Sequence, residues 1–210
     1  YYSNADGTIY DGWLYYGKDW YYIDDGKMQT GWVTSKGKGY YLGIDGKLVS
    51  GWYHYNYKVV GYSNEYWMYM NTDGSRYTGW VSSGGKWHYI NSSTMLCDEW
   101  DDCVNIEHYR KSDGEIDYDK YYEACNKSRG YVFDKTGAMV TGWYRTTGVS
   151  EGGKVYGSSW YYMDSDGQGH QGWLYYNGSW YYFVKGKMQT NCIAPDGSYL
   201  GADGISRKIR

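Results

Sequence analysis

Six Gly-Trp pairs recur along this 210-residue chain and constrain its fold more than any other feature. The clearest unit, residues 12–30, reads Gly-Trp-Leu-Tyr-Tyr, a Gly-Lys-Asp turn, Trp-Tyr-Tyr-Ile, an Asp-Asp-Gly-Lys turn and Met-Gln-Thr; a near copy occupies 172–190. A short fixed period indicates a repeat architecture, in which each unit covers the apolar face of its neighbour. The pairs begin at Gly12, Gly31, Gly51, Gly79, Gly142 and Gly172.

Each unit predicts a β-hairpin, because two short β-prone runs flank a turn that contains glycine. One hairpin of this length cannot bury enough surface to be stable alone, whereas stacked copies can. We therefore expect an all-β fold: a β-solenoid of stacked short hairpins that forms a single domain over residues 1–210. Insertions at 55–65 and 146–159 lengthen two of the turns.

A larger departure from the repeat spans about 93–129, within the fourth unit, and is acidic. Segments 99–111 and 117–127 each permit a short helix, so we expect a small helical insertion. The stretch around Asp113-Gly114 is similar to the middle of an EF-hand loop, but Lys111 and Lys120 stand where oxygen ligands belong. No metal site is therefore predicted.

The last segment, 191–210, has lost most of its aromatic residues, which is typical of the terminal cap of a stacked array. Four cysteines make an even number, and aromatic, glycine-rich repeats of this kind are typical of exported proteins, so disulfides are expected. The sequence leaves three pairings open. The candidates are Cys97, Cys103, Cys125 and Cys192.

The aromatic residues are 31 Tyr and 12 Trp against 2 Phe, which favours half-exposed binding surfaces over an oily core. The net charge of −3, without a basic stripe, argues against nucleic acid as a partner. No apolar run of about 18 residues predicts a membrane span. The four histidines share no spacing with a carboxylate or serine that would suggest a catalytic triad, so an enzyme is not predicted. The start at Tyr1-Tyr2, in the middle of the pattern, is expected of a piece of a longer protein.

The combination of Gly-Trp, a turn, Trp-Tyr-Tyr, Asp-Gly-Lys-Met and Thr-Gly-Trp resembles the choline-binding, or cell-wall-binding, repeats of Gram-positive surface proteins and phage lysins. Glucan-binding repeats and clostridial-toxin repeats share the scaffold but usually keep only one tryptophan per unit. Here a second tryptophan and a methionine recur, which favours the choline-binding branch. These residues are Trp20, Trp67, Trp87, Trp160 and Trp180, and Met28, Met139 and Met188.

The resemblance implies binding sites between consecutive hairpins, each with two tryptophans of one repeat, an aromatic residue of the next, and a nearby Met or Leu. The alternative for any of these rings is packing in the interior. The candidate sets are Trp13 and Trp20 with Met28 and Tyr41; Trp32 and Tyr40 with Tyr69; Trp52 and Trp67 with Tyr89; Trp80 and Trp87 with Phe133; Trp143 with Tyr131 or Trp160 and with Tyr162 or Tyr182; and Trp173 with Trp180.

The resemblance further implies a secreted, non-catalytic module at a bacterial cell surface, without a cofactor, that binds choline or the phosphocholine of teichoic acid. A quaternary ammonium has no donor on nitrogen, so a protein recognises it by surrounding it with π faces. Tyr and Trp also stack on sugar rings, and the competing reading is therefore a carbohydrate-binding module for an α-glucan or a host glycan. A third reading is a spacer or a protein-docking surface on the insertion.

Overall fold

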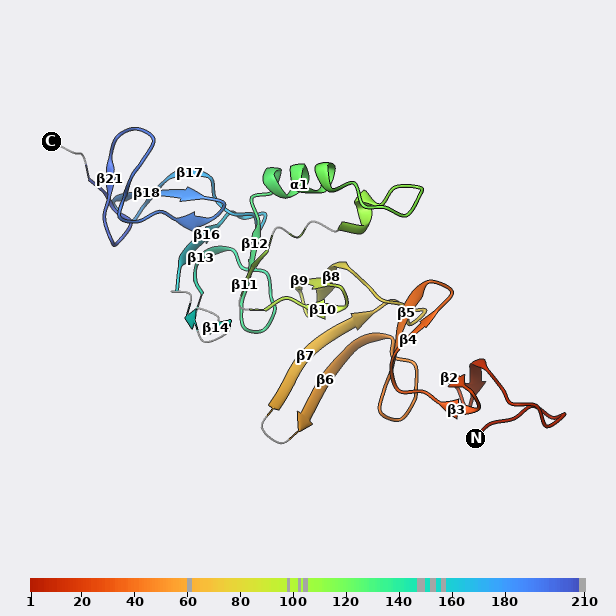
Figure 1. Ribbon diagram of the computed structural model, residues 1–210. Coiled ribbons are helices and arrows are strands. Elements are labelled where there is room, and N and C mark those ends of the chain that lie inside the picture. Colours follow the sequence, from red (N-terminus) through yellow and green to blue (C-terminus); the bar gives the residue numbers. More distant parts are fainter. Residues whose placement is uncertain are drawn as a thin grey trace. The chain divides into compact units, whose positions relative to one another are not determined.

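The computed structural model describes residues 1–59, 62–97, 99–101, 103, 106–146, 150–151, 154–155 and 158–207. These residues form two compact units. The first consists of 1–78 and 90–95, and the second of 79–89 and 96–210. Each unit is a series of antiparallel β-hairpins (Figure 1).

The first unit contains three hairpins, β1–β2, β4–β5 and β6–β7. The insertion expected to lengthen the turn at 55–65 instead lengthens the two strands of the hairpin. β6 and β7 have nine residues each and pair along their length as the long hairpin of Figure 1. Two-residue turns close the short hairpins, with positive φ at Gly17 and Lys18 and at Lys36 and Gly37. The strands are β1 (Gly12–Tyr16), β2 (Asp19–Asp24), β3 (Lys27–Met28), β4 (Gly31–Ser35), β5 (Lys38–Leu42), β6 (Gly51–Val59), β7 (Tyr62–Met70) and β10 (Thr94–Met95).

In the second unit the last hairpins form a five-stranded sheet in the order β13-β16-β19-β18-β17, in which β19 links two successive hairpins. The last two residues of β9 belong to the first unit. The elements of the second unit are β8 (Gly79–Ser83), β9 (Lys86–Asn91), β11 (Glu99–Asp101), the 3-10 helix η1 (Ile106–Tyr109), α1 (Tyr118–Lys127), β12 (Tyr131–Phe133), β13 (Gly142–Arg145), β14 (Ser150–Glu151), β15 (Lys154–Val155), β16 (Trp160–Met163), β17 (Gly172–Tyr176), β18 (Ser179–Val184), β19 (Lys187–Met188), β20 (Cys192–Ile193), β21 (Tyr199–Leu200) and β22 (Ser206–Arg207).

A further hairpin, without a Gly-Trp pair, lies between the fourth and fifth pairs. β11 and β12 pair with Glu99 opposite Phe133, the register that Gly12 and Ile23 have in β1–β2. Glu99-Trp100 follows Gly79-Trp80 at the base period of 20 residues. The strand pairing therefore places the described residues between its two strands, which include η1 and α1, at the tip of this hairpin.

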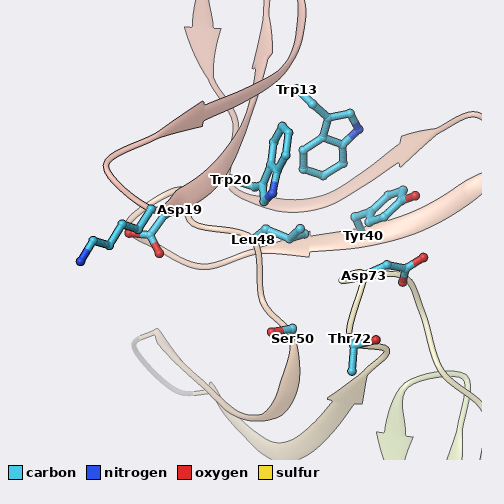
Figure 2. Close-up of a pocket in the computed structure, with 9 residues that line it drawn as sticks. Trp13, Asp19, Trp20, Tyr40, Leu48, Ser50, Thr72 and Asp73 are labelled. Atoms are coloured by element: carbon cyan, nitrogen blue, oxygen red, sulfur yellow. The ribbon is translucent and has the colours of Figure 1, made fainter.

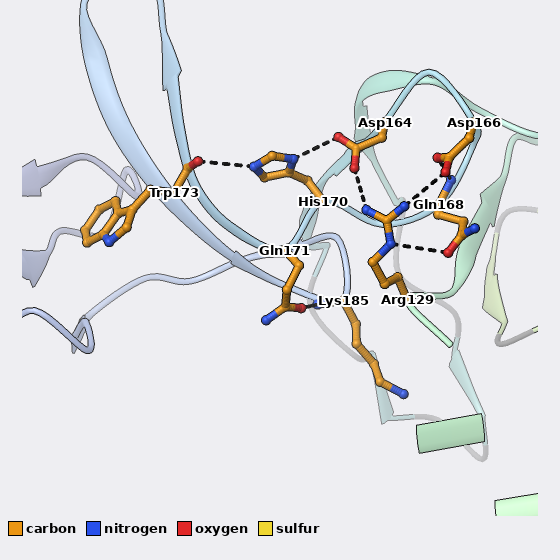
Figure 3. A network of polar contacts seen from close by, with 8 residues as sticks. All are labelled: Arg129, Asp164, Asp166, Gln168, His170, Gln171, Trp173 and Lys185. Atoms are coloured by element: carbon orange, nitrogen blue, oxygen red, sulfur yellow. Dashed lines mark hydrogen bonds and ion pairs between the residues drawn. The ribbon is translucent and has the colours of Figure 1, made fainter. Parts of the chain in front are cut away.

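The helix expected at 117–127 is confirmed by α1, which begins after the capping residue Asp117. The segment 99–111, which the sequence permits to hold a short helix, contains only the 3-10 helix η1, because its first residues, Glu99–Asp101, pair with β12. The segment after α1 is anchored by Arg129, whose guanidinium binds Asp164 at 2.6 Å and Asp166 at 3.0 Å (Figure 3). The carbonyl of Cys125 accepts a hydrogen bond from Lys185 Nζ at 2.8 Å.

A tight turn of one recurring type ends many of the repeats, and it explains the sequence around Asp113. In this turn a carboxylate accepts the N–H two residues later and a glycine N–H closes the loop, as at Asp45 and Gly46. Asp113 accepts the Glu115 N–H at 2.9 Å in the same way. The EF-hand-like stretch is thus a repeat turn within the insertion. The bridges that define these turns are Ser3–Ile9, Leu42–Leu48, Met70–Arg76, Arg110–Ile116, Phe133–Met139 and Met163–Gly169.

Successive repeats stack through an apolar side chain on a glycine. Met28 follows the turn that ends the first repeat. Its sulfur lies where a Cβ at Gly46, in the turn of the next repeat, would collide with it. Glycine is required here for two reasons: its φ is positive, and its lack of a side chain leaves room for the Met28 thioether. The other pairs of this kind are Ile9 on Gly26, Leu48 on Gly74, Met139 on Gly167 and Met188 on Gly204.

Each unit has its own apolar cluster. Tyr41, Val49, Met68 and Met70 are buried together in the first unit, and burial raises the pKa of Tyr41 to about 12. In the second, the buried residues Tyr89, Leu96 and Phe133 pack against partly buried neighbours. These neighbours are Trp80, Cys103, Tyr131 and Met139.

The expected disulfides are absent: all four cysteines lie in the described residues, and no bond joins them. Cys97 is exposed, whereas Cys103 packs against the second cluster. Cys125 lies in α1 and Cys192 in β20, so the four thiols lie in four different local environments. Among the described residues, no helix is long and apolar enough to cross a membrane.

Candidate functional site

A pocket of about 500 Å³ lies between the first and second repeats. Trp13, Trp20 and Tyr40 gather around Leu48 in this pocket, with Asp19 and Asp73 on opposite sides (Figure 2). The Trp13 and Tyr40 ring centroids are 4.9 Å apart with the planes at 71°. We call this set of four, Trp13, Trp20, Tyr40 and Leu48, the first cage.

A second pocket, of about 470 Å³, repeats the arrangement in the second unit. Trp143 and Trp160 have ring centroids 6.0 Å apart, and Tyr181 of the next hairpin lies 5.3 Å from Trp143. Met188 lines the same pocket, in the place that Leu48 has in the first. We call Trp143, Trp160, Tyr181 and Met188 the last cage.

The same four positions occur once more, at Trp80, Trp87, Tyr131 and Met139, which we call the middle cage. The Trp80 ring lies 4.7 Å from that of Tyr131 and 6.5 Å from that of Trp87. Met139 donates its N–H to the Trp87 carbonyl at 2.7 Å, just as Leu48 donates to the Trp20 carbonyl at 2.8 Å. One backbone geometry therefore supplies the fourth residue of both cages.

In the first and last cages the third ring differs from the expected one, because the expected tyrosines pair with the tryptophan of their own hairpin. Trp32 lies directly opposite Tyr41 in β4–β5, with the rings 5.3 Å apart, so Tyr41 does not line the first cage. The residue before it, Tyr40, lines the cage instead. The same holds for Tyr69 with Trp52 (5.2 Å), Tyr89 with Trp80 (5.2 Å), Tyr162 with Trp143 (5.5 Å) and Tyr182 with Trp173 (5.1 Å).

Two other expected residues also lie elsewhere. Phe133 is fully buried in the second cluster, so Tyr131 is the third ring of the middle cage. Met28 packs on Gly46 and does not line the first cage, where Leu48 stands.

The remaining pairs have two tryptophans each but different surroundings. Trp52 and Trp67 are 6.3 Å apart, and His54 stacks on Trp67 at 4.7 Å. Trp173 and Trp180 are 6.4 Å apart and contact Tyr182 and Tyr175 of their own hairpin. The expected set of Trp32 with Tyr40 and Tyr69 is not brought together, since Tyr40 faces Trp13.

Carboxylates lie at the rims of the two pockets. Asp73 lines the first, and the hydroxyl and N–H of Ser75 lower its pKa. Asp203 lines the last, and a hydrogen bond from Arg207 lowers its pKa to about 2. Both groups are therefore ionised at neutral pH. Among the described residues, no group of three or more His, Cys, Asp or Glu is arranged to hold a metal.

The fold and these pockets define a class of protein: a hairpin-repeat binding module with aromatic cages between successive repeats. Five segments match the family of putative cell wall binding repeats. These segments of the chain are therefore similar to the repeats of that family. The matched segments are 11–28, 30–48, 78–93, 154–168 and 171–186.

Solved structures extend the similarity to the whole chain. CbpJ of Streptococcus pneumoniae is 25% identical with a TM-score of 0.57, and choline binding protein F of the same organism is 26% identical with a TM-score of 0.53. The match covers 99% of this chain and 61% of each of theirs, so the chain spans about three fifths of their length. The autolysin LytC of S. pneumoniae, at 22% identity and a TM-score of 0.53, shares the fold. A search of curated protein sequences gave no match.

Proposed function

We propose that this chain is a non-catalytic module that binds choline, as the phosphocholine of teichoic acid, in its first, middle and last cages. The observation that carries the proposal is the convergence of two tryptophans of one repeat with an aromatic ring and an apolar side chain of the next. The same four positions provide it three times. In each, the rings supply π faces and the Leu or Met closes the floor.

Such a cage suits a quaternary ammonium. Each ring contributes about 0.5–2 kcal/mol of cation–π attraction, more as water is excluded, and tryptophan is the strongest partner. The ionised carboxylates at the rims, Asp73 and Asp203, neutralise the cations that pair with them, Lys38 and Arg207, and so limit the repulsion of a cationic ligand. We expect millimolar affinity for a single cage, about −4 kcal/mol. Several cages on one chain would bind a polymer far more tightly.

The related proteins support this assignment and its location. CbpJ and choline binding protein F carry the same fold, and a structure of the latter was determined in the presence of a peptidoglycan analogue. We infer a secreted module at a bacterial cell surface, a single solenoid over 1–210 with a tip insertion and a cap at 191–210. The packing of Met or Leu on glycine supports the stacking of successive repeats within each unit.

Calorimetry tests the proposal directly. Choline titrated into the protein at tens of millimolar should give heats that saturate, and Trp143→Ala should remove part of the binding. Tyr175→Ala, which removes a ring that lies outside the cages, is the matched control and should leave binding unchanged. Binding of dextran without any response to choline would instead support the α-glucan alternative, which rests on the same exposed tryptophans.

A further inference from the structure

The second inter-repeat position has the geometry of a cage but different side chains. Arg76 donates its N–H to the Gly39 carbonyl at 2.8 Å, the bond that Leu48 makes to Trp20 in the first cage. Gly39 thus stands in the place of the second tryptophan, and Arg76 in the place of the Leu or Met. Trp32 alone keeps its usual role.

The Arg76 side chain lies over the remaining tryptophan. Its guanidinium carbon is 4.5 Å from the Trp32 ring centroid, which is cation–π distance. A Cβ at Gly39 would lie 3.6 Å from Arg76 Nε and 3.8 Å from Cζ. The guanidinium therefore stands directly beside the site where a larger side chain would begin, on a tryptophan that remains 42% exposed.

We propose that Arg76 is a built-in cation that occupies the second position and excludes a quaternary ammonium from Trp32. This inference rests on the proposed function of the cages. A tethered group that is already in place acts at an effective concentration of millimolar or more, which matches or exceeds the expected affinity of one cage. Choline must therefore displace the guanidinium to reach the Trp32 ring, and Gly39 supplies no second tryptophan ring that would offset this cost. Arg76 would thereby set which repeats bind ligand and would join the second repeat to the third.

Indole N–H resonances in a choline titration followed by NMR test this proposal. In the wild type, the indole signals of Trp13 and Trp20 should shift with choline while that of Trp32 stays in place. In Arg76→Met, which introduces the residue type of the middle and last cages, the Trp32 signal should become responsive. Lys38→Met, which removes an exposed cation of the same hairpin, is the matched control and should leave Trp32 unresponsive.

A second variant tests the site without depending on one resonance. Gly39 has no positive φ, so its backbone accepts a larger residue, and Gly39→Trp with Arg76→Met should add one binding equivalent in calorimetry. A Trp32 signal that shifts in the wild type alongside Trp13 would overturn the inference. So would an unresponsive Trp32 in Arg76→Met together with no added equivalent in the double variant. If choline shifts none of the indoles, the proposed function itself fails, a pattern distinct from both.

Discussion

The indole N–H groups of two equivalent tryptophans differ in their hydrogen bonding. Trp13 Nε1 donates to the Ser35 hydroxyl at 3.1 Å, whereas Trp143 Nε1 is buried and has no hydrogen-bond partner in the described structure. Tyr176 occupies in the last cage the strand position that Ser35 has in the first, and its ring lies 5.6 Å from Trp143. The last cage thus gains a fourth ring and leaves one donor unsatisfied.

Ser35→Ala should lower the free energy of unfolding by about 1 kcal/mol, because it leaves the partly buried Trp13 N–H without its acceptor. Urea unfolding measures the change. Thr34→Ala, at an exposed position of the same strand, should cost less. Equal effects of the two substitutions would show that the hydrogen bond does not stabilise the cage.

Asp203 provides a charge test at the last cage. Its pKa of about 2 lies below the ordinary 3.8, so its contribution to stability is present above the ordinary value and is lost as the pH falls through about 2. Choline affinity at this cage should therefore be constant between about pH 5 and pH 8. Asp203→Asn should weaken choline binding by about two- to five-fold, since it leaves Arg207 as an uncompensated cation beside the pocket.

Asp196→Asn is the matched control, because Asp196 makes the same turn bond, to Ser198, but does not line the pocket. Calorimetry at two pH values compares the variants. An equal loss of choline affinity in the two variants would rule out a direct role of the Asp203 charge. So would an equal loss of affinity for uncharged dextran in Asp203→Asn.

The tryptophans that line the cages follow from the sequence, and the tyrosines do not. The Gly-Trp and Trp-Tyr-Tyr patterns mark Trp13 and Trp20 because a repeat fixes them, whatever the stacking. Whether Tyr40 or Tyr41 completes the cage depends on which face of the next hairpin meets the previous one. Alternation within a strand says only that the two point to opposite faces. The choice is made by tertiary packing, where Tyr41 joins Val49 and Met68 in the apolar cluster.

At the scale of the elements, the turns join one repeat to the next. Gly46→Ala should be strongly destabilising, by about 2 kcal/mol or more, because it adds both an unfavourable positive φ and a collision with Met28. Gly37→Ala has the same φ within a degree but nothing within 4 Å, so it isolates the backbone cost, about 1–2 kcal/mol. Thermal unfolding compares the two. Equal losses would mean that the thioether contact contributes nothing to stacking.

The hairpin β11–β12 cannot be predicted from local sequence patterning alone. It begins with Glu99-Trp100 rather than Gly-Trp, and residues 102–130 separate its two strands in the sequence, so local patterning permits a short helix at 99–111 instead. The period was the available signal, since Glu99 lies 20 residues after Gly79. The Asp-Gly turn around Asp113 was visible in the sequence, but its equivalence to the repeat turns follows from hydrogen bonds. The predicted disulfides are wrong because an even number of cysteines says nothing about the distances between their side chains.

At the scale of the whole molecule, several weak cages should act together on a polymer. Trp20→Ala should lower free-choline binding only by the share of one cage. Retention on a choline-bearing polymer should fall on the order of ten-fold or more, because the loss of one anchor removes its effective-concentration gain. Trp32→Ala is the matched control, with a similarly exposed tryptophan, 42% against 46%, that Arg76 covers. Retention that follows free-choline affinity in both variants would mean that the cages do not act together.

The central claim is that choline binds between successive hairpins at four recurring positions. A crystal structure of the protein with choline at tens of millimolar tests it most directly. The account predicts a trimethylammonium group enclosed by Trp13, Trp20 and Tyr40, with equivalent density in the middle and last cages and none over Trp32. Choline-free cages at that concentration, or choline bound against Trp32 in place of Arg76, would contradict it.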